Sequence, residues 1–67
     1  MGNYNTPIHK KLCMTVEEAA EYAMIGEQRL RKIIDSDKTL DWVLYVGSWI
    51  RIKRPQFEQW VLNQRFL

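Results

Sequence analysis

Apolar side chains recur at helical spacing early in the chain, and the stripe that they form is narrow and made of small residues. It consists of Val16, Ala19, Ala20 and Ala23. Thr15 and Glu18 have the spacing of a capping box, in which each side chain accepts a hydrogen bond from the other residue's backbone N–H. We therefore predict a first helix that begins at Thr15 and that another helix can cross closely.

A second apolar stripe follows Gly26 and predicts a second helix from about residue 27 to residue 36. Its apolar members are Leu30, Ile33 and Ile34. Polar side chains fall opposite or beside this stripe, and they are Gln28, Arg29, Arg31 and Lys32. Two short helices joined by a tight turn, the second with a basic outer face, are typical of a helix-turn-helix.

The middle of the chain changes to a β pattern. Residues 42–46 and 49–53 are β-prone runs, and Gly47 and Ser48 between them suit a two-residue hairpin turn. In this register one face of the hairpin suits the core and carries Val43, Tyr45, Ile50 and Ile52. The other face carries Leu44, Val46, Trp49 and Arg51.

The flanking segments complete the expected fold. Residues 12–14 form a brief apolar run that predicts a short strand, and Pro55 suits the first turn of a last helix, whose Phe57, Trp60 and Val61 should dock on the first two helices. We therefore expect an α+β winged helix in the order strand-helix-helix-strand-strand-helix. Residues 11–67 should form one domain, and residues 1–10 a flexible N-terminal arm.

Charge is segregated along the chain although the formal net charge is only +2. Six of the ten basic residues lie in the clusters 29–32 and 51–54, whereas the acids other than Glu58 lie within residues 17–27 and 35–41. A one-sided binder of nucleic acid needs such a distribution. The basic side chains of the second helix could simply be an ordinary solvated face. The hypothesis of nucleic-acid binding therefore depends on the order of the elements, in which an acidic helix precedes a basic one.

Other kinds of chemistry find little support in the sequence. The three glycines are scattered, and His9 and Cys13 are the sole residues of their types, so we expect no phosphate-binding loop, no zinc site, no cofactor and no enzymatic activity. One unpaired cysteine and the lack of a long apolar run favour a cytoplasmic protein with no membrane contact. Gly2 and Thr6 match an acylation pattern, but no second membrane signal accompanies them.

These patterns assign roles to particular side chains on double-stranded DNA. Gln28, Arg29 and Lys32 should read or flank base edges, and Arg31 shares their basic helix. Arg51, Lys53 and Arg54 should mostly hold the DNA backbone, because they cluster in and after the hairpin. Trp49 on the hairpin is a further candidate, with the alternative that it simply covers the hairpin's outer face beside Val46. No small-molecule substrate is expected.

A specific family likeness rests on residues spread from about Leu12 to Trp60. They are Thr15-Val16-Glu17-Glu18-Ala19-Ala20, Ile25-Gly26-Glu27, Leu30-Arg31, Trp42, Gly47, Ile50, Ile52-Lys53-Arg54 and Gln56-Phe57-Glu58. In this order they resemble the excisionases of conjugative transposons, which are similar to MerR-type winged helices, bind DNA beside the ends of the element and assist a tyrosine integrase in excision. The resemblance implies that the second helix enters the major groove and that the hairpin is the wing.

The sequence departs from the broader MerR-like and phage-excisionase pattern at two places. Met24 and Gly26 stand where a glycine before the turn and a serine or threonine cap are common, and the wing carries Trp49 in place of a basic or polar residue. Two alternative functions remain open. A small MerR-like transcriptional regulator would bind DNA with the same groove contacts, and a protein–protein interaction module would not bind DNA.

One recognition helix reads too little DNA to define an address. A helix over residues 27–36 is about 15 Å long and covers about four base pairs. Selectivity among the 10⁶ or more competing sites of a genome must therefore come from neighbours, either adjacent copies of the protein or the integrase. The exposed part of the last helix and the tail with Phe66 and Leu67 are the expected contacts, unless Phe66 merely caps the core.

Overall fold

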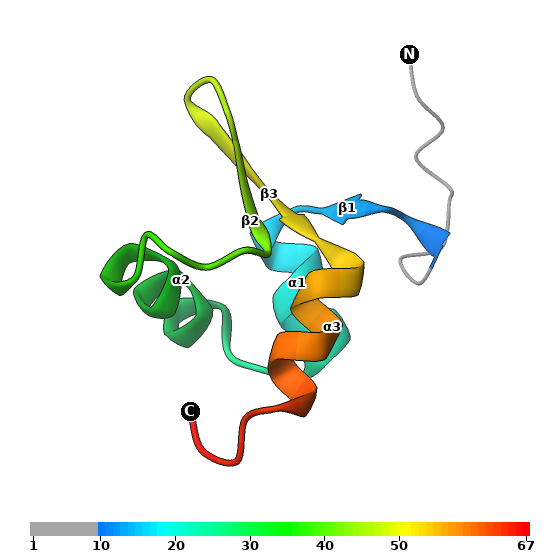
Figure 1. The fold of residues 1–67 in the computed structure, drawn as a ribbon, viewed down its shortest axis with the longest axis vertical. Coiled ribbons are helices and arrows are strands. Elements are labelled where there is room, and N and C mark those ends of the chain that lie inside the picture. The colour runs from blue at the N-terminus through cyan, green and yellow to red at the C-terminus, as the bar shows by residue number, and fades with distance from the viewer. Residues whose placement is uncertain (1–9) are drawn as a thin grey trace.

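The computed structural model describes residues 10–67 and has the predicted α+β winged-helix organisation (Figure 1). In this range the elements are β1 (Cys13–Met14), α1 (Val16–Ala23), α2 (Glu27–Ser36), β2 (Val43–Val46), β3 (Trp49–Lys53) and α3 (Arg54–Leu62). The expected order of strands and helices is confirmed. The expected N-terminal arm, with the acylation pattern and His9, lies outside the described residues except for Lys10.

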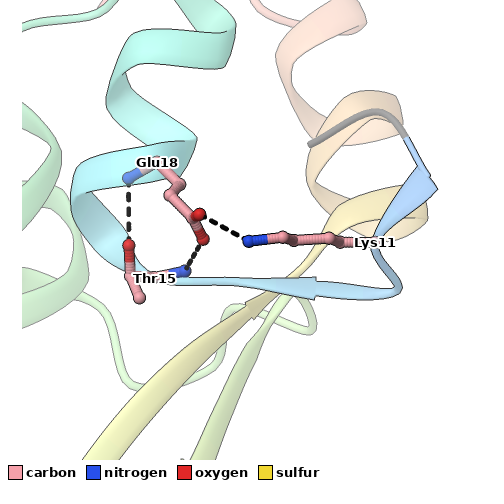
Figure 2. Close-up of polar contacts among 3 residues, drawn as sticks. All are labelled: Lys11, Thr15 and Glu18. Carbon is pink, nitrogen blue, oxygen red and sulfur yellow. Dashed lines mark hydrogen bonds and ion pairs between the residues drawn. The ribbon is translucent and has the colours of Figure 1, made fainter. Parts of the chain in front are cut away.

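The start of α1 is the capping box that the sequence predicts (Figure 2). The Thr15 hydroxyl oxygen accepts a hydrogen bond from the Glu18 N–H at 3.1 Å, and the Thr15 N–H donates to Glu18 Oε1 at 3.0 Å. Lys11 Nζ lies 2.7 Å from Glu18 Oε2. The Lys11 ammonium and the Thr15 N–H stabilise the carboxylate form and hold the pKa of Glu18 below its ordinary value.

The turn between α1 and α2 uses a left-handed residue that is not glycine. Met24 has φ 58° and ψ 39°, and its side chain is 92% exposed. The Ile25 N–H donates to the Ala20 carbonyl at 2.9 Å and the Met24 N–H to the Glu21 carbonyl at 3.2 Å. This pair of bonds is a Schellman motif, which ends α1 abruptly and lets α2 begin after Gly26.

The sheet is antiparallel with strand order β1-β3-β2, and its hairpin projects away from the helices (Figure 1). Val43 pairs with Ile52 and Val46 with Trp49, as the sequence predicts. Gly47 has φ 59°, a conformation that the tight turn requires and that a side chain disfavours. The prediction that Tyr45 suits the core is wrong: its side chain is 51% exposed, whereas Val43, two positions farther from the hairpin turn on the same face, is buried.

The core is built around aromatic rings and α1's small residues. The largest fully buried side chains are Trp42, Phe57, Met14, Leu30 and Ile52. Trp42 lies just before β2, outside the strand to which the pattern assigned it, and its ring centroid is 5.0 Å from those of both Phe57 and Trp60. The α3 helix packs against α1 and β3. None of the helices in residues 10–67 is long and apolar enough to cross a membrane.

Candidate nucleic-acid interface

The exposed side of α2 gathers the three residues that were predicted to read base edges. Gln28, Arg29 and Lys32 all line one hollow of about 540 Å³, together with Gly26, Ile33 and Ser36. The opposite side of the helix buries Leu30 and Ile34 in the core. Because α2 is fixed by its buried side, this hollow and its two cations face outward.

Arg31 lies on another side of α2, because two positions along a helix differ by about 200° in direction. It pairs with Glu27 one turn earlier, with Nη2 2.8 Å and Nε 2.9 Å from Glu27 Oε2. Arg31 also lines a second hollow of about 310 Å³ with Arg51, between the start of α1 and β3. The structure thus separates Arg31 from the hollow of Arg29 and Lys32 and places it beside the wing.

The outer face of the hairpin is apolar and carries one cation. Trp49 is 64% exposed, and Leu44 and Val46 are exposed on the same face. The Arg51 guanidinium carbon lies 5.1 Å from the centre of the Trp49 ring, and its Nη1 donates to the Ile50 carbonyl at 2.9 Å. The guanidinium therefore makes a cation–π interaction with the indole ring, which stabilises its position.

Lys53 and Arg54 lie where β3 passes into α3, and they differ in how their charges are used. Lys53 is half-buried and pairs with Cys13 of β1. Arg54 donates from Nε to the Lys11 carbonyl at 2.7 Å and from Nη1 to Glu58 Oε2 at 3.1 Å. The structure does not bring Arg54 to either hollow, and its guanidinium is bonded to groups within the chain.

Glu58, the acid of α3, joins Arg54 to α1. Glu58 accepts a hydrogen bond from the Tyr22 hydroxyl of α1 as well as from Arg54. The Tyr22 hydroxyl, and after it the Arg54 guanidinium, hold the pKa of Glu58 below its ordinary value. The network joins α1, α3 and the residues before β1, so it supports the packing of these elements.

The ion pairs identify the cations that remain available for an anionic partner. Within residues 10–67 the pairs are Lys11–Glu18, Arg31–Glu27 and Arg54–Glu58. In that part of the chain seven cations have no carboxylate partner. Four of them belong to α2 and β3, and they are Arg29, Lys32, Arg51 and Lys53; the others are Lys10, Lys38 and Arg65. No cluster of three or more potential metal-ligating side chains occurs in the described range.

One contact at this site was not predicted from the sequence. Arg29 Nη1 donates to the main-chain oxygen of Leu67 at 2.8 Å, although the two residues are 38 positions apart. Phe66, by contrast, is 84% exposed and does not cap the core. No local pattern signals the Arg29 contact, because it depends on how α3 is placed relative to α2.

Two comparisons with known proteins give the same result. The family described as "Excisionase from transposon Tn916" matches residues 2–64. A curated protein of Streptococcus agalactiae serotype V (strain ATCC BAA-611 / 2603 V/R), also described as "Excisionase from transposon Tn916", is 39% identical over 59 residues, which cover 88% of each chain.

Proposed function

This chain belongs to the family of excisionases from transposon Tn916, and from that membership we propose that it binds double-stranded DNA and assists a tyrosine integrase in excising a conjugative transposon. The observation that carries the DNA-binding part is the outward side of α2, where Gln28, Arg29 and Lys32 share one hollow. Neither of its cations has a carboxylate partner in residues 10–67. The role is architectural and non-catalytic, exerted in the cytoplasm.

The two projecting elements divide the contacts with the duplex. The α2 helix enters the major groove, where an arginine pairs well with guanine and a glutamine with adenine. Arg51, supported by the Trp49 ring, and Lys53 contact phosphates beside it. Arg31 can reach a phosphate only by leaving Glu27, and Arg54 serves mainly to hold the residues before β1 against α3.

Two alanine substitutions test this division of labour. Arg29→Ala should relax the preference for particular base pairs, because it removes a base contact. Lys53→Ala should weaken binding to all duplexes about equally, because a phosphate carries no sequence information. Binding of each variant to a panel of single-base-pair variants of a bound site distinguishes the two results. Equal and unselective losses from both variants would contradict the assignment.

The dependence of binding on salt tests the phosphate contacts as a group. Four to six contacts predict that log affinity falls against log salt concentration with a slope of roughly −4 to −5. A protein–protein interaction module, which the exposed apolar face of the hairpin would suit, gives no salt-dependent binding to duplex DNA. The two functions are separated by measuring the affinity for one duplex between about 50 and 300 mM salt. Over this range the Debye length falls from about 14 to about 6 Å, so phosphate contacts are increasingly screened.

The biological role is tested by where the protein binds. The α2 helix has 10 residues and spans about 15 Å, so one copy reads about four base pairs and acts beside adjacent copies or the integrase. Footprinting along the element should show several bound sites next to those of the integrase near the ends. A single operator over one promoter would instead support a transcriptional regulator. Excision in cells with and without the protein completes the test.

A further inference from the structure

Residues 64–67 leave the end of α3 and return toward α2 (Figure 1). The beginning of this tail is fixed by hydrogen bonds to the last turn of the helix. Gln64 donates from its backbone N–H to the Val61 carbonyl at 3.0 Å and from Nε2 to the Trp60 carbonyl at 3.2 Å. The tail therefore leaves the helix in a defined direction, and Leu67 reaches Arg29.

The tail binds a donor that the proposed function requires elsewhere. Arg29 recognises a guanine best by donating two hydrogen bonds, to O6 and N7 of one base. In the free protein Nη1 of Arg29 donates to the main-chain oxygen of Leu67 at 2.8 Å. A fork contact with a base that uses Nη1 in the direction it now takes requires Arg29 to release the tail.

The hydrogen bond between Arg29 and Leu67 is weak enough for DNA to displace it, so it would reduce DNA binding without preventing it. The hydrogen bond is exposed, and the tail buries little apolar surface, since Phe66 is 84% and Leu67 is 45% exposed. An exposed bond of this kind is close in free energy to its broken state. A tail that is closed for about half to four-fifths of the time lowers the apparent affinity about two- to fivefold.

We propose that residues 64–67 act as an internal competitor of DNA, which holds Arg29 in the free protein and is displaced when the duplex arrives. This inference rests on the proposed DNA binding through α2. It also gives the tail a role in the free protein alone, distinct from the integrase or neighbour contact that the sequence suggested. The competition raises the DNA concentration that is needed for half-maximal binding, and it leaves the contacts in the complex unchanged.

A double-mutant cycle tests the competition. One change removes Phe66 and Leu67, which takes away the main-chain oxygen and leaves Arg65 in place. The other is Arg29→Ala, and the two are also combined. Affinities are measured by fluorescence anisotropy at one fixed salt concentration, with a labelled duplex taken from the end of the element that carries the gene. Phe66→Ser is the matched control, because it keeps the main-chain oxygen of Leu67.

The truncation should raise the affinity of the otherwise unchanged chain about two- to fivefold and leave that of the Arg29→Ala protein unchanged. The Phe66→Ser control should bind as the unchanged chain does. Equal effects of truncation in both backgrounds, or a loss of affinity, would overturn the proposed competition. So would unchanged DNA binding with impaired excision, which would instead support integrase docking.

Two controls separate this inference from other causes. The truncated chain should melt at the same temperature as the full chain, and a clear fall would show that the tail supports the fold instead. If the full chain fails to bind the duplex even at low salt, the proposed function itself is overturned. Normal binding that is insensitive to the truncation rejects the competition alone.

Discussion

Met24 occupies a position where glycine should make the protein more stable. An L-residue in the left-handed conformation costs about 1–2 kcal/mol relative to the right-handed one. Met24 has φ 58° and is 92% exposed, so replacing it removes little buried apolar surface. Glycine offsets part of the gain, because it loses about 0.5–1 kcal/mol more backbone entropy on folding. Met24→Gly should therefore raise the free energy of unfolding by about 0.5–1 kcal/mol.

Urea and thermal unfolding followed by circular dichroism measure this difference. For a domain of this size, 1 kcal/mol corresponds to about 4–8 °C, so the melting temperature should rise by roughly 2–8 °C. Met24→Ala is the matched control, because alanine shortens the side chain but keeps the Cβ that makes the conformation unfavourable. A Met24→Gly protein that is less stable than the original, or no more stable than Met24→Ala, would show that the left-handed conformation of Met24 costs no stability.

Two further predictions concern acids that hold basic side chains. The pKa of Glu18 is lowered in the folded state, so the unfolded chain binds more protons, and stability is lost as pH falls from about 5 through the folded pKa. Glu18→Gln should therefore reduce the loss of stability with falling pH, measured by urea unfolding at several pH values. The part of the loss that remains should come from Asp37 and Glu58, whose pKa values are also lowered. Glu27→Gln should free Arg31, strengthen DNA binding several-fold at low salt, and steepen the salt slope by about 0.9 while changing stability by less than about 0.5 kcal/mol. An unchanged slope in the anisotropy titrations would mean that Arg31 does not reach a phosphate.

Local signals account for the parts of the fold that the sequence predicts well. The capping box at Thr15, the apolar stripe before residue 36 and the glycine of the hairpin turn each act over a few residues, and the elements begin and end where these signals place them. Trp42 shows the limit of such patterns. It resembles the first residue of a strand, but its burial against Phe57 and Trp60 depends on how α3 folds back.

In the candidate site, too, local patterns predict some features, and others depend on the packing of distant segments. Helical periodicity placed Gln28, Arg29, Arg31 and Lys32 opposite or beside the apolar stripe. The structure gathers three of them in one hollow, whereas Arg31 pairs with Glu27. Periodicity could not reveal that Arg54 is bonded to the Lys11 carbonyl, because that bond spans 43 positions. The pair of Arg54 with Glu58, by contrast, has the local i,i+4 spacing of one helix. A basic residue close to a hairpin in sequence can be consumed by the packing of distant segments.

The junction of β3 with α3 has a mechanical consequence. The strand ends at Lys53 and the helix begins at Arg54, with no loop residue between them. Hydrogen bonds from the Lys53 N–H to the Trp42 carbonyl and from the Arg54 N–H to the Leu12 carbonyl, both 2.8 Å long, clamp the junction on two sides. Because no loop residue and no free backbone donor separates the strand from the helix, we expect the hairpin and α3 to tilt together when the wing meets a partner.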